Sequence, residues 1–228
     1  MLLSFVFYLS VLIKHQHIIR NQSFFLLAQR AIFWEEEACL IISDLHLGKS
    51  HHFRKSGVGV PKTGDYKNLS IVKGLIDVWQ PKELLLLGDL FHSEANHHVL
   101  EVKDFFDNYP NLTRHLVVGN HDIMDESWYQ LLNLVIHREK LNWGPFSFTH
   151  EPLEEEALQD KTYNICGHIH PAVKLVGKGR QSITLPCFYF SEKQAVLPAF
   201  GKFTGNYRIK PLTNDKIFAI ANKSIIAL

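Results

Sequence analysis

The sequence predicts an α/β fold in which strands and helices alternate before a final run of antiparallel strands. Short apolar runs at 40–43, 83–88, 115–119, 146–150 and 163–167 are each bounded by glycine or a polar residue, which is typical of buried strands. Apolar residues at helical spacing lie between the earlier runs. From about residue 172 the helical spacing stops, and the remaining apolar stretches are typical of antiparallel sheet.

The individual elements follow in chain order. From Phe24, the segment FFLLAQRAIFW, the acidic turn EEEA and the run CLIIS predict a hairpin of two β-rich runs that enters the core. Helices are expected over 69–79 and 99–106, each ending before a proline, and a shorter helix is expected within 127–135. We find no internal repeat, low-complexity segment or linker in the sequence.

The length of 228 residues, 46% of them hydrophobic, predicts a single domain over residues 24–228, preceded by an N-terminal extension of uncertain structure over 1–23. The apolar run at 2–13 is shorter than the roughly 20 residues that a membrane-spanning helix needs. It also lacks the basic region and the cleavage site of a signal peptide. We therefore expect a cytoplasmic protein that does not associate with membranes.

Composition narrows the chemistry. The 24 lysines and arginines balance 23 acids, so the sequence has no broad cationic field, although a local basic groove stays compatible with this balance. The three cysteines are an odd number without a C-x-x-C spacing, which predicts neither a disulfide framework nor a thiolate zinc site. The unusual feature is fourteen histidines, because imidazoles are common metal ligands and near-neutral acids and bases.

Polar side chains follow nearly every apolar run. In an open α/β fold, the loops at the carboxyl ends of parallel strands converge on one crevice. Each motif alone is weak and is also typical of turns, but five strand ends with metal-competent side chains together predict one metal site. These candidates, in chain order, are Asp44 and His46; Asp89; Asn120, His121 and Asp122; His150; and His168 and His170.

This ordered set resembles the calcineurin-like metallophosphoesterase superfamily over residues about 40–171. The resemblance implies an α/β fold with a two-sheet β-sandwich core flanked by helices. The longer strings SDLHLGKSHHFRKSG, LLGDLFHS, GHIHPAV, LPCF and LPAFGKFTG resemble the bacterial DNA-ligase-associated metallophosphoesterases, relatives of the SbcD-type repair nucleases. One position departs from the superfamily pattern, because Thr149 precedes His150 where a glycine is common.

The resemblance implies two divalent metal ions. Imidazole, carboxylate and amide ligands without thiolate suit Mn²⁺, Fe or Zn²⁺, and the resemblance favours Mn²⁺. By similarity, the first metal would be held by Asp44, His46 and His170, the second by Asn120, His150 and His168, and Asp89 would bridge the two.

The same resemblance implies hydrolysis of a phosphoester by metal-activated hydroxide. His121 would protonate the leaving oxygen, and Asp122 could orient that imidazole; alternatively, Asp122 is a surface or N-cap carboxylate before the helix near residue 126. His52, Arg54 and His92 are candidates for substrate contacts, although a basic run after a ligand loop is often simply solvated.

Three functional hypotheses follow. The leading one is a phosphodiesterase acting on phosphodiesters such as DNA, for which the resemblance implies a DNA-repair setting and a functional association with a DNA ligase and a helicase. A small-molecule phosphatase or cyclic-nucleotide phosphodiesterase is the alternative, favoured by the near-neutral charge. A catalytically inactive scaffold is disfavoured, because all the expected ligands and His121 are present.

Overall fold

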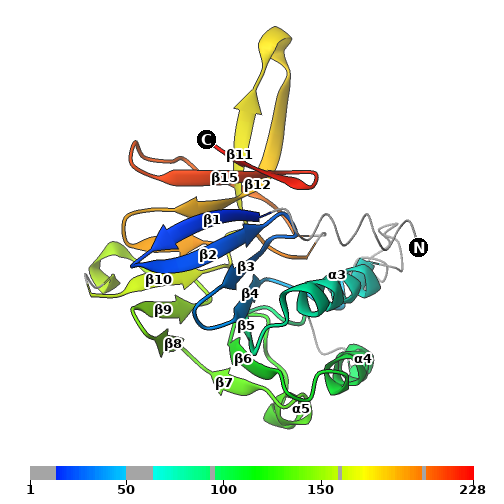
Figure 1. Ribbon diagram of the computed structural model, residues 1–228. Helices are drawn as coiled ribbons and strands as arrows, with labels where there is room; N and C mark the ends of the chain where they lie inside the picture. The colour runs from blue at the N-terminus through cyan, green and yellow to red at the C-terminus, as the bar shows by residue number, and fades with distance from the viewer. Residues whose placement is uncertain (1–13, 50–63, 93–95, 159–160, 202–203) are drawn as a thin grey trace.

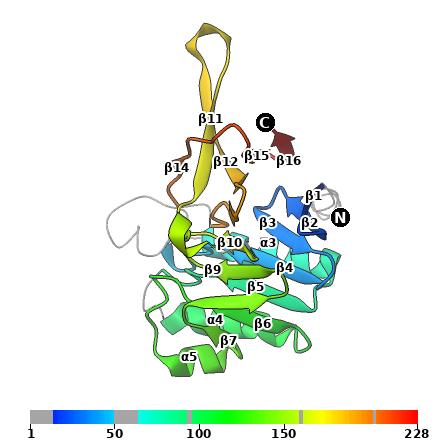
Figure 2. The same ribbon diagram turned by 90° about the vertical axis from the view of Figure 1, so that its left-hand side faces the viewer.

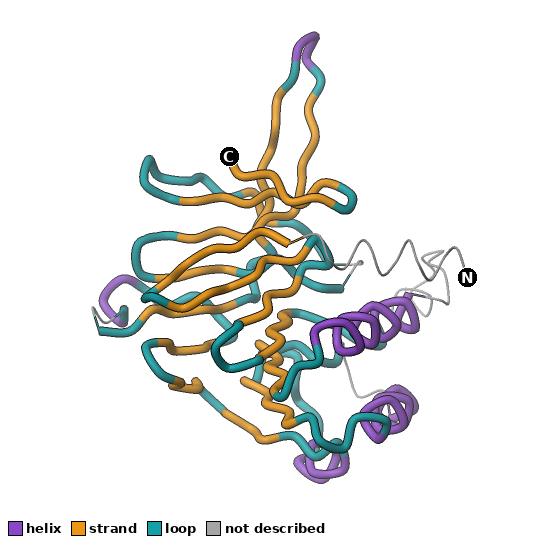
Figure 3. The backbone as a smooth tube through the Cα atoms, viewed as in Figure 1, coloured by secondary structure: helices purple, strands orange, loops and turns teal. Residues whose placement is uncertain are grey.

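The structure is a computed structural model, and it describes residues 14–49, 64–92, 96–158, 161–201 and 204–228 (Figure 1). Two sheets face each other, and the three α-helices of the described residues lie on the outer side of the first sheet (Figure 3). This is the α/β fold with a two-sheet core and flanking helices that the sequence predicts. Among the described residues, no helix combines the length and the apolar character needed to cross a membrane.

The first sheet has seven strands in the order of the sequence. Its first four strands form an antiparallel meander, and its last four run parallel to one another. The strands are β1 (Lys14–Ile19), β2 (Gln22–Leu27), β3 (Ala31–Trp34), β4 (Cys39–Ser43), β5 (Glu83–Leu87), β6 (Thr113–Val117) and β7 (Val135–His137). The helices that connect the parallel strands are α3 (Gly64–Trp79), α4 (Asn96–Asp107) and α5 (Glu126–Leu131).

The second sheet has nine strands, of which β15 and β16 extend sideways from β12. The pairs β9–β10, β10–β13 and β11–β14 are parallel, and the other pairs are antiparallel. In sequence order these strands are β8 (Lys140–Trp143), β9 (Phe146–Thr149), β10 (Tyr163–Cys166), β11 (Pro171–Val176), β12 (Ser182–Phe190), β13 (Gln194–Val196), β14 (Tyr207–Arg208), β15 (Lys216–Ala221) and β16 (Ser224–Ala227). Two short 3₁₀ turns complete it, η1 (Glu155–Ala157) and η2 (Lys178–Arg180).

Two apolar layers hold these elements together. Successive side chains of a strand point to opposite faces, so a strand covered on both faces is apolar throughout. In β4, Leu40 and Ile42 pack beneath the helices, whereas Cys39 and Ile41 face the second sheet. Trp34 also faces the second sheet and is completely buried. The continuous apolar runs of the sequence thus reflect burial on both faces.

The strand ends that the sequence analysis assigned to one crevice come from two sheets. The runs at 40–43, 83–88 and 115–119 became β4, β5 and β6, and those at 146–150 and 163–167 became β9 and β10. The first three belong to the first sheet, and the last two pair with each other in the second. The crevice therefore lies between two sheets, and the sequence did not show which run joins which sheet, because an apolar run contains no information about its partner strand.

Two further expectations need correction, one on the segment after Phe24 and one on the last third of the chain. In addition, the sheet begins at Lys14, inside the segment 1–23 whose structure the sequence left uncertain. Alternate residues of β1 are exposed, so this edge strand lacks the apolar run that identifies the buried strands. The segment after Phe24 forms three strands rather than two, because a turn around Arg30 separates β2 from β3. The last third of the chain also contains parallel pairs.

His17 on β1 packs against the aromatic rings of the second sheet. Its ring centroid lies 4.5 Å from that of Phe190 and 5.1 Å from that of Phe218. Burial, with the charges of Lys216 and His15, lowers the pKa of His17 to about 4. The folded protein therefore binds this proton less readily than the unfolded chain does.

Protonation of His17 therefore lowers the free energy of unfolding as the pH falls. Above pH 6.5 His17 is neutral in both states, and as the pH falls from 6.5 towards 4, protonation favours the unfolded chain. We expect His17→Gln to lose less free energy of unfolding than the wild type between pH 7 and pH 5, as measured by urea denaturation in the presence of EDTA. The side chain is partly exposed, so the difference should be a fraction of the roughly 1.4 kcal/mol per pH unit of a fully linked group. Equal losses in both proteins would contradict the packing described here.

Candidate metal centre

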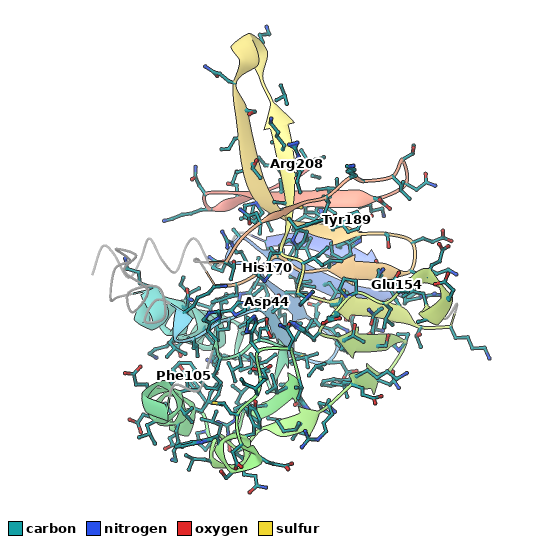
Figure 4. All side chains as sticks on the ribbon, turned by 180° about the vertical axis from the view of Figure 1, so that it is seen from behind. Asp44, Phe105, Glu154, His170, Tyr189 and Arg208 are labelled. Atoms are coloured by element: carbon teal, nitrogen blue, oxygen red, sulfur yellow. The ribbon has the colours of Figure 1, made fainter. Side chains whose placement is uncertain are left out.

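The carboxyl ends of five strands bring the predicted ligands to one place between the two sheets. The ligands from the first sheet follow β4, β5 and β6, and they are Asp44, His46, Asp89 and Asn120. Those from the second sheet follow β9 and β10, and they are His150, His168 and His170. Figure 4 shows Asp44 and His170 side by side, although they belong to different sheets.

The ligand atoms form two groups. In the first, those of Asp44, His46 and His170 all lie within 4.8 Å of one another. In the second, those of Asp89, His150 and His168 meet the same limit. The Asn120 Oδ1 atom lies 3.1 Å from His150 Nε2, so Asn120 belongs beside the second group. The structure therefore brings together all seven residues that the resemblance implied as ligands, in the same division.

The carboxylate of Asp89 lies between the two groups. Its Oδ2 atom is 3.5 Å from Nε2 of His46, and its Oδ1 atom is 3.5 Å from Nε2 of His150. Each oxygen thus faces a different group, which is the geometry of a carboxylate that bridges two cations. Asp89 and His46 are both almost completely buried.

Several polar atoms of the centre lack a partner among the described residues. They are buried and without a hydrogen bond: Asp44 Oδ1, both ring nitrogens of His46 and His170 Nε2. An unsatisfied buried polar group costs about 1–3 kcal/mol, so four of them at one point require a compensating partner. A divalent cation in each group would supply it, and the donor set of imidazole, carboxylate and amide suits a transition metal.

The environment of His150 points to the same partner. Its Nδ1 atom lies 3.0 Å from the carbonyl oxygen of Leu87, which can only accept a hydrogen bond, so Nδ1 carries the proton. Its Nε2 atom then carries a lone pair, yet it lies 3.1 Å from the Asn120 oxygen, which is also an acceptor, and 3.0 Å from Nδ1 of His168. Lone pairs that converge in this way are stabilised by a cation. The residues of the chain therefore fit a pair of metal ions.

Contacts behind the ligands fix their orientation. Nδ1 of His170 lies 3.2 Å from the carbonyl oxygen of Gly205, which leaves Nε2 directed at Asp44. The backbone N–H of His168 donates to Asp44 Oδ2 at 3.0 Å, and the hydroxyl of Ser43 donates to the same oxygen. Such outer contacts select the tautomer of a ligating imidazole and hold its ring in place.

Most of the ligands have a strained backbone. The residues with φ between 46° and 68° include Asp44, His46, Asp89, His168 and His170. This left-handed region costs a residue other than glycine on the order of 1–3 kcal/mol and is tolerated where the surroundings enforce it. The strain at Asp44, His46 and Asp89 has no sequence signal.

Glycines before the ligands leave space that a side chain would fill. A Cβ atom at Gly119 would clash with Oδ1 and the backbone nitrogen of Asp89, and one at Gly167 would clash with the Ser43 side chain and with Asp44 Oδ2 at 2.6 Å. A Cβ atom at Gly88 would meet the ring of His150. The G-D, G-N and G-H pairs of the sequence therefore serve close packing of the centre as well as turn formation.

Protonation states in the centre suit metal binding. Burial lowers the pKa of His46 to about 3, and the charge of Lys49 acts in the same direction, so its imidazole is neutral. Burial opposes ionisation of Asp44, but the imidazole of His170, whose Nε2 lies 3.4 Å from Asp44 Oδ1, and the nearby charge of His150 hold the pKa of Asp44 below the usual value. A neutral imidazole and an ionised carboxylate are the forms that coordinate metals.

His121 lies beside the ligands without belonging to either group. Its ring centroid is 5.4 Å from that of His46 and 5.1 Å from that of His92. Its backbone N–H donates to Asp89 Oδ1 at 2.9 Å, which fixes the loop on which it stands. The ring of His92 is itself 5.6 Å from that of His46, so the predicted substrate contact His92 borders the centre. The other two predicted contacts, His52 and Arg54, lie outside the described residues.

Asp122 differs from both sequence expectations. Its carboxylate accepts hydrogen bonds from the backbone N–H groups of Leu90 at 2.9 Å, Phe91 at 3.4 Å and Gly119 at 2.9 Å. It therefore joins the loops after β5 and β6, and the N-cap of α5 is Asp125 instead. Burial raises the pKa of Asp122 to about 6, with a contribution from the charge of Asp89 and against the effect of the backbone hydrogen bonds. Through these contacts Asp122 holds the loops after β5 and β6 in position.

Sequence reasoning missed two residues of the centre. Lys49 is partly buried, and its ammonium interacts with the charges of Asp44 and Asp89, while burial lowers its pKa. Its position directly after the Asp44-x-His46 motif was an available signal. Gly205, whose carbonyl group contacts His170, lies far along the chain and carries no such signal.

A scan against protein-family models decides the family. The model described as calcineurin-like phosphoesterase matches residues 39–201, which is most of the chain and contains every ligand described above. The chain belongs to the calcineurin-like phosphoesterase family. It is therefore a metal-dependent hydrolase, and the family implies two divalent metals, in agreement with the two ligand groups.

Two solved structures are similar to this chain to different extents. The structure of the Pseudomonas putida nuclease MPE has a TM-score of 0.79 and 28% sequence identity, and the match covers 94% of this phosphoesterase and 100% of that chain. A protein of unknown function from Aquifex aeolicus, AQ665, has a TM-score of 0.40 and 20% identity, with 58% of this chain and 78% of that chain covered. No curated protein matches this phosphoesterase.

The space beside Gly119 provides a test of the bridging carboxylate. We expect Gly119→Ala to displace Asp89, so that the metal content of the purified protein, measured by elemental analysis, falls below that of the wild type. Overpacking of this kind typically costs about 1–3 kcal/mol of stability. The matched control is Gly177→Ala, because nothing lies closer than 3.9 Å to a Cβ atom at that position. Full metal content in the Gly119 variant would mean that Asp89 is not confined as described.

Proposed function

We propose that this calcineurin-like phosphoesterase is a nuclease that hydrolyses phosphodiester bonds in DNA with Mn²⁺ in both metal positions. The observation that carries the proposal is the Asp89 carboxylate, whose two oxygens face His46 and His150 at 3.5 Å each. When bound, two divalent ions so bridged would supply charge stabilisation on both sides of a phosphoryl group and an activated water. Fe and Zn²⁺ suit the same ligands.

The similarity to the Pseudomonas putida nuclease MPE supports the choice of a phosphodiester substrate. That similarity extends over 94% of this chain and all of that one, so it includes the strands outside the metal centre. By contrast, the near-neutral net charge of +1 favours a small-molecule phosphatase or cyclic-nucleotide phosphodiesterase, which is the second candidate.

The chain's own residues have distinct tasks in this reaction. His121 stands beside the ligands with its ring outside both groups, where it can donate a proton to the leaving oxygen. Asp122 holds the loop of His121 through Gly119 and the neighbouring loop through Leu90. Lys49 adds a positive charge beside Asp44 and Asp89, where a substrate phosphate would accumulate negative charge.

We further propose a DNA-repair setting for this phosphoesterase. The strings that resemble DNA-ligase-associated phosphoesterases support a role in DNA repair, together with a DNA ligase and a helicase as functional partners. Three free and buried cysteines suit the reducing cytoplasm.

A comparison of substrates separates the two candidates. With Mn²⁺, we expect the protein to hydrolyse bis-p-nitrophenyl phosphate faster than p-nitrophenyl phosphate, and to degrade a single-stranded oligodeoxynucleotide. Release of p-nitrophenolate and gel electrophoresis measure the two reactions. Preferential hydrolysis of the monoester, with the oligonucleotide left intact, would favour the phosphatase and reject the nuclease.

The role of His121 is tested by the leaving group. We expect His121→Ala to lower cleavage of the oligonucleotide by roughly 10²–10⁴-fold, because its alkoxide leaving group needs a proton. Hydrolysis of bis-p-nitrophenyl phosphate should fall far less, because p-nitrophenolate leaves without protonation. The control is His15→Ala on the distant strand β1, which should change neither rate. An equal loss on both substrates, accompanied by a loss of metal, would instead make His121 a metal ligand.

A further inference from the structure

The hairpin of β11 and β12 extends well beyond the rest of the molecule (Figures 1 and 2). It begins at Pro171, directly after the ligand His170, and its strands are paired from Ala172↔Pro186 to Val176↔Ser182. We call this part, residues 171–186, the arm. Its outer half is exposed, with Val176 at 72% and Ile183 at 55% relative exposure. Burial of apolar surface therefore does not explain why the chain builds it.

The charge of this part of the chain is unlike that of the whole. The complete sequence has 24 basic and 23 acidic residues. Between residues 171 and 214 the only acid is Glu192, whereas the basic residues are Lys174, Lys178, Arg180, Lys193, Lys202, Arg208 and Lys210. The near-neutral chain therefore has a local excess of positive charge in residues 171–214. This segment begins directly after the ligand His170.

The strand register places several of these cations on one face. Arg208 of β14 lies beside Ala172, and Lys174 is two residues further along the same face of β11. The hydrogen bond from the Ile209 N–H to the Ala172 carbonyl continues this pairing, so Lys210 follows on the side of Arg208. Figure 4 shows Arg208 at the arm, above His170 and Asp44 in that view.

The opposite face of the arm is used for packing. Val173 and Leu185 contact the small apolar cluster that includes Ile209 and Ile217. Lys174, Arg208 and Lys210 are exposed, and so is Lys178 in the turn at the tip of the arm. The four cations therefore form a solvent-facing strip, here called the basic ribbon, with its inner end beside His170.

We propose that the basic ribbon binds the phosphate backbone of a nucleic-acid strand whose scissile bond lies at the metal centre. This inference rests on the proposed nuclease activity and assigns the part of the surface that holds the substrate. A strand rises about 3.3 Å per residue, so Lys174 lies roughly 13 Å along the arm from His170 and Lys178 about twice as far. The ribbon thus contacts phosphates several nucleotides from the cut.

This distance explains how a protein of near-zero net charge can select a polymer. A small diester fills the metal centre and does not reach the ribbon, whereas each phosphate of a bound strand that meets a lysine or arginine releases condensed counterions. The basic ribbon should therefore contribute to the affinity for oligonucleotides, and this contribution should depend strongly on salt. It should contribute nothing to the affinity for small diesters.

The test removes three charges from the ribbon in the full-length protein. The ribbon variant is Lys174→Gln/Arg208→Gln/Lys210→Gln. The matched control, Lys82→Gln/Lys161→Gln/Lys223→Gln, removes three exposed lysines from other parts of the surface. The Mn²⁺-loaded proteins are assayed for cleavage of a fluorescein-labelled 30-nucleotide oligodeoxythymidine and of bis-p-nitrophenyl phosphate. Binding of the same oligonucleotide is measured by fluorescence anisotropy in EDTA at several KCl concentrations, and circular dichroism checks folding.

We expect the KM and Kd of the ribbon variant for the oligonucleotide to rise by on the order of tenfold or more at low salt. The slope of log Kd against log [KCl] should decrease by about two, because each phosphate contact to a single strand contributes roughly 0.7. Hydrolysis of bis-p-nitrophenyl phosphate should remain as in the wild type. The control variant should keep most of the affinity.

The outcomes separate this inference from the nuclease proposal. If the ribbon variant binds the oligonucleotide as tightly as the control does, the ribbon inference is overturned, whether or not the protein cleaves DNA. Wild-type protein that fails to bind the oligonucleotide overturns it as well, and the arm then serves a different partner. If the wild type binds the oligonucleotide through the ribbon but cleaves only small diesters, the ribbon stands and the nuclease activity is rejected.

Discussion

The shared carboxylate of Asp89 is the contact on which the metal centre depends. One oxygen faces His46 of the first sheet and the other faces His150 of the second. The position is set by the absence of a side chain at Gly119 and by the hydrogen bond from the His121 N–H. Because the carboxylate contacts His46 of the first group as well as His150 of its own, any movement of Asp89 alters both groups and the loop of His121 together.

Holding these ligands has an energetic cost that the rest of the fold offsets. Five of them adopt left-handed backbone conformations, and several of their polar atoms are buried without partners in the chain. Opposing this, aromatic residues such as Trp34, Phe146 and Phe148 are completely buried between the sheets, each contributing on the order of 1.5–3 kcal/mol. The sandwich is thus a rigid support, and metal ions would relieve the remaining electrostatic cost.

Much of this arrangement of strands and ligands could be predicted from the sequence. Strands such as β5 are buried on both faces, and a continuous apolar run followed by Gly88-Asp89 identifies both the strand and the ligand at its end. Strand pairing was not accessible in this way, because the run that forms β9 does not specify β10 rather than β7 as its neighbour. The function of Asp122 was also missed, since its partners are backbone N–H groups, which every residue except proline possesses.

The division of the ligands between two sheets has a consequence for biosynthesis. A ribosome that has produced only the first sheet has made Asp44, His46, Asp89 and Asn120, but neither ligand group is complete until the residues up to His170 have emerged and the second sheet has packed. A truncated or nascent chain therefore lacks the assembled centre. The phosphoesterase centre therefore forms only after both sheets have been synthesised and have packed together.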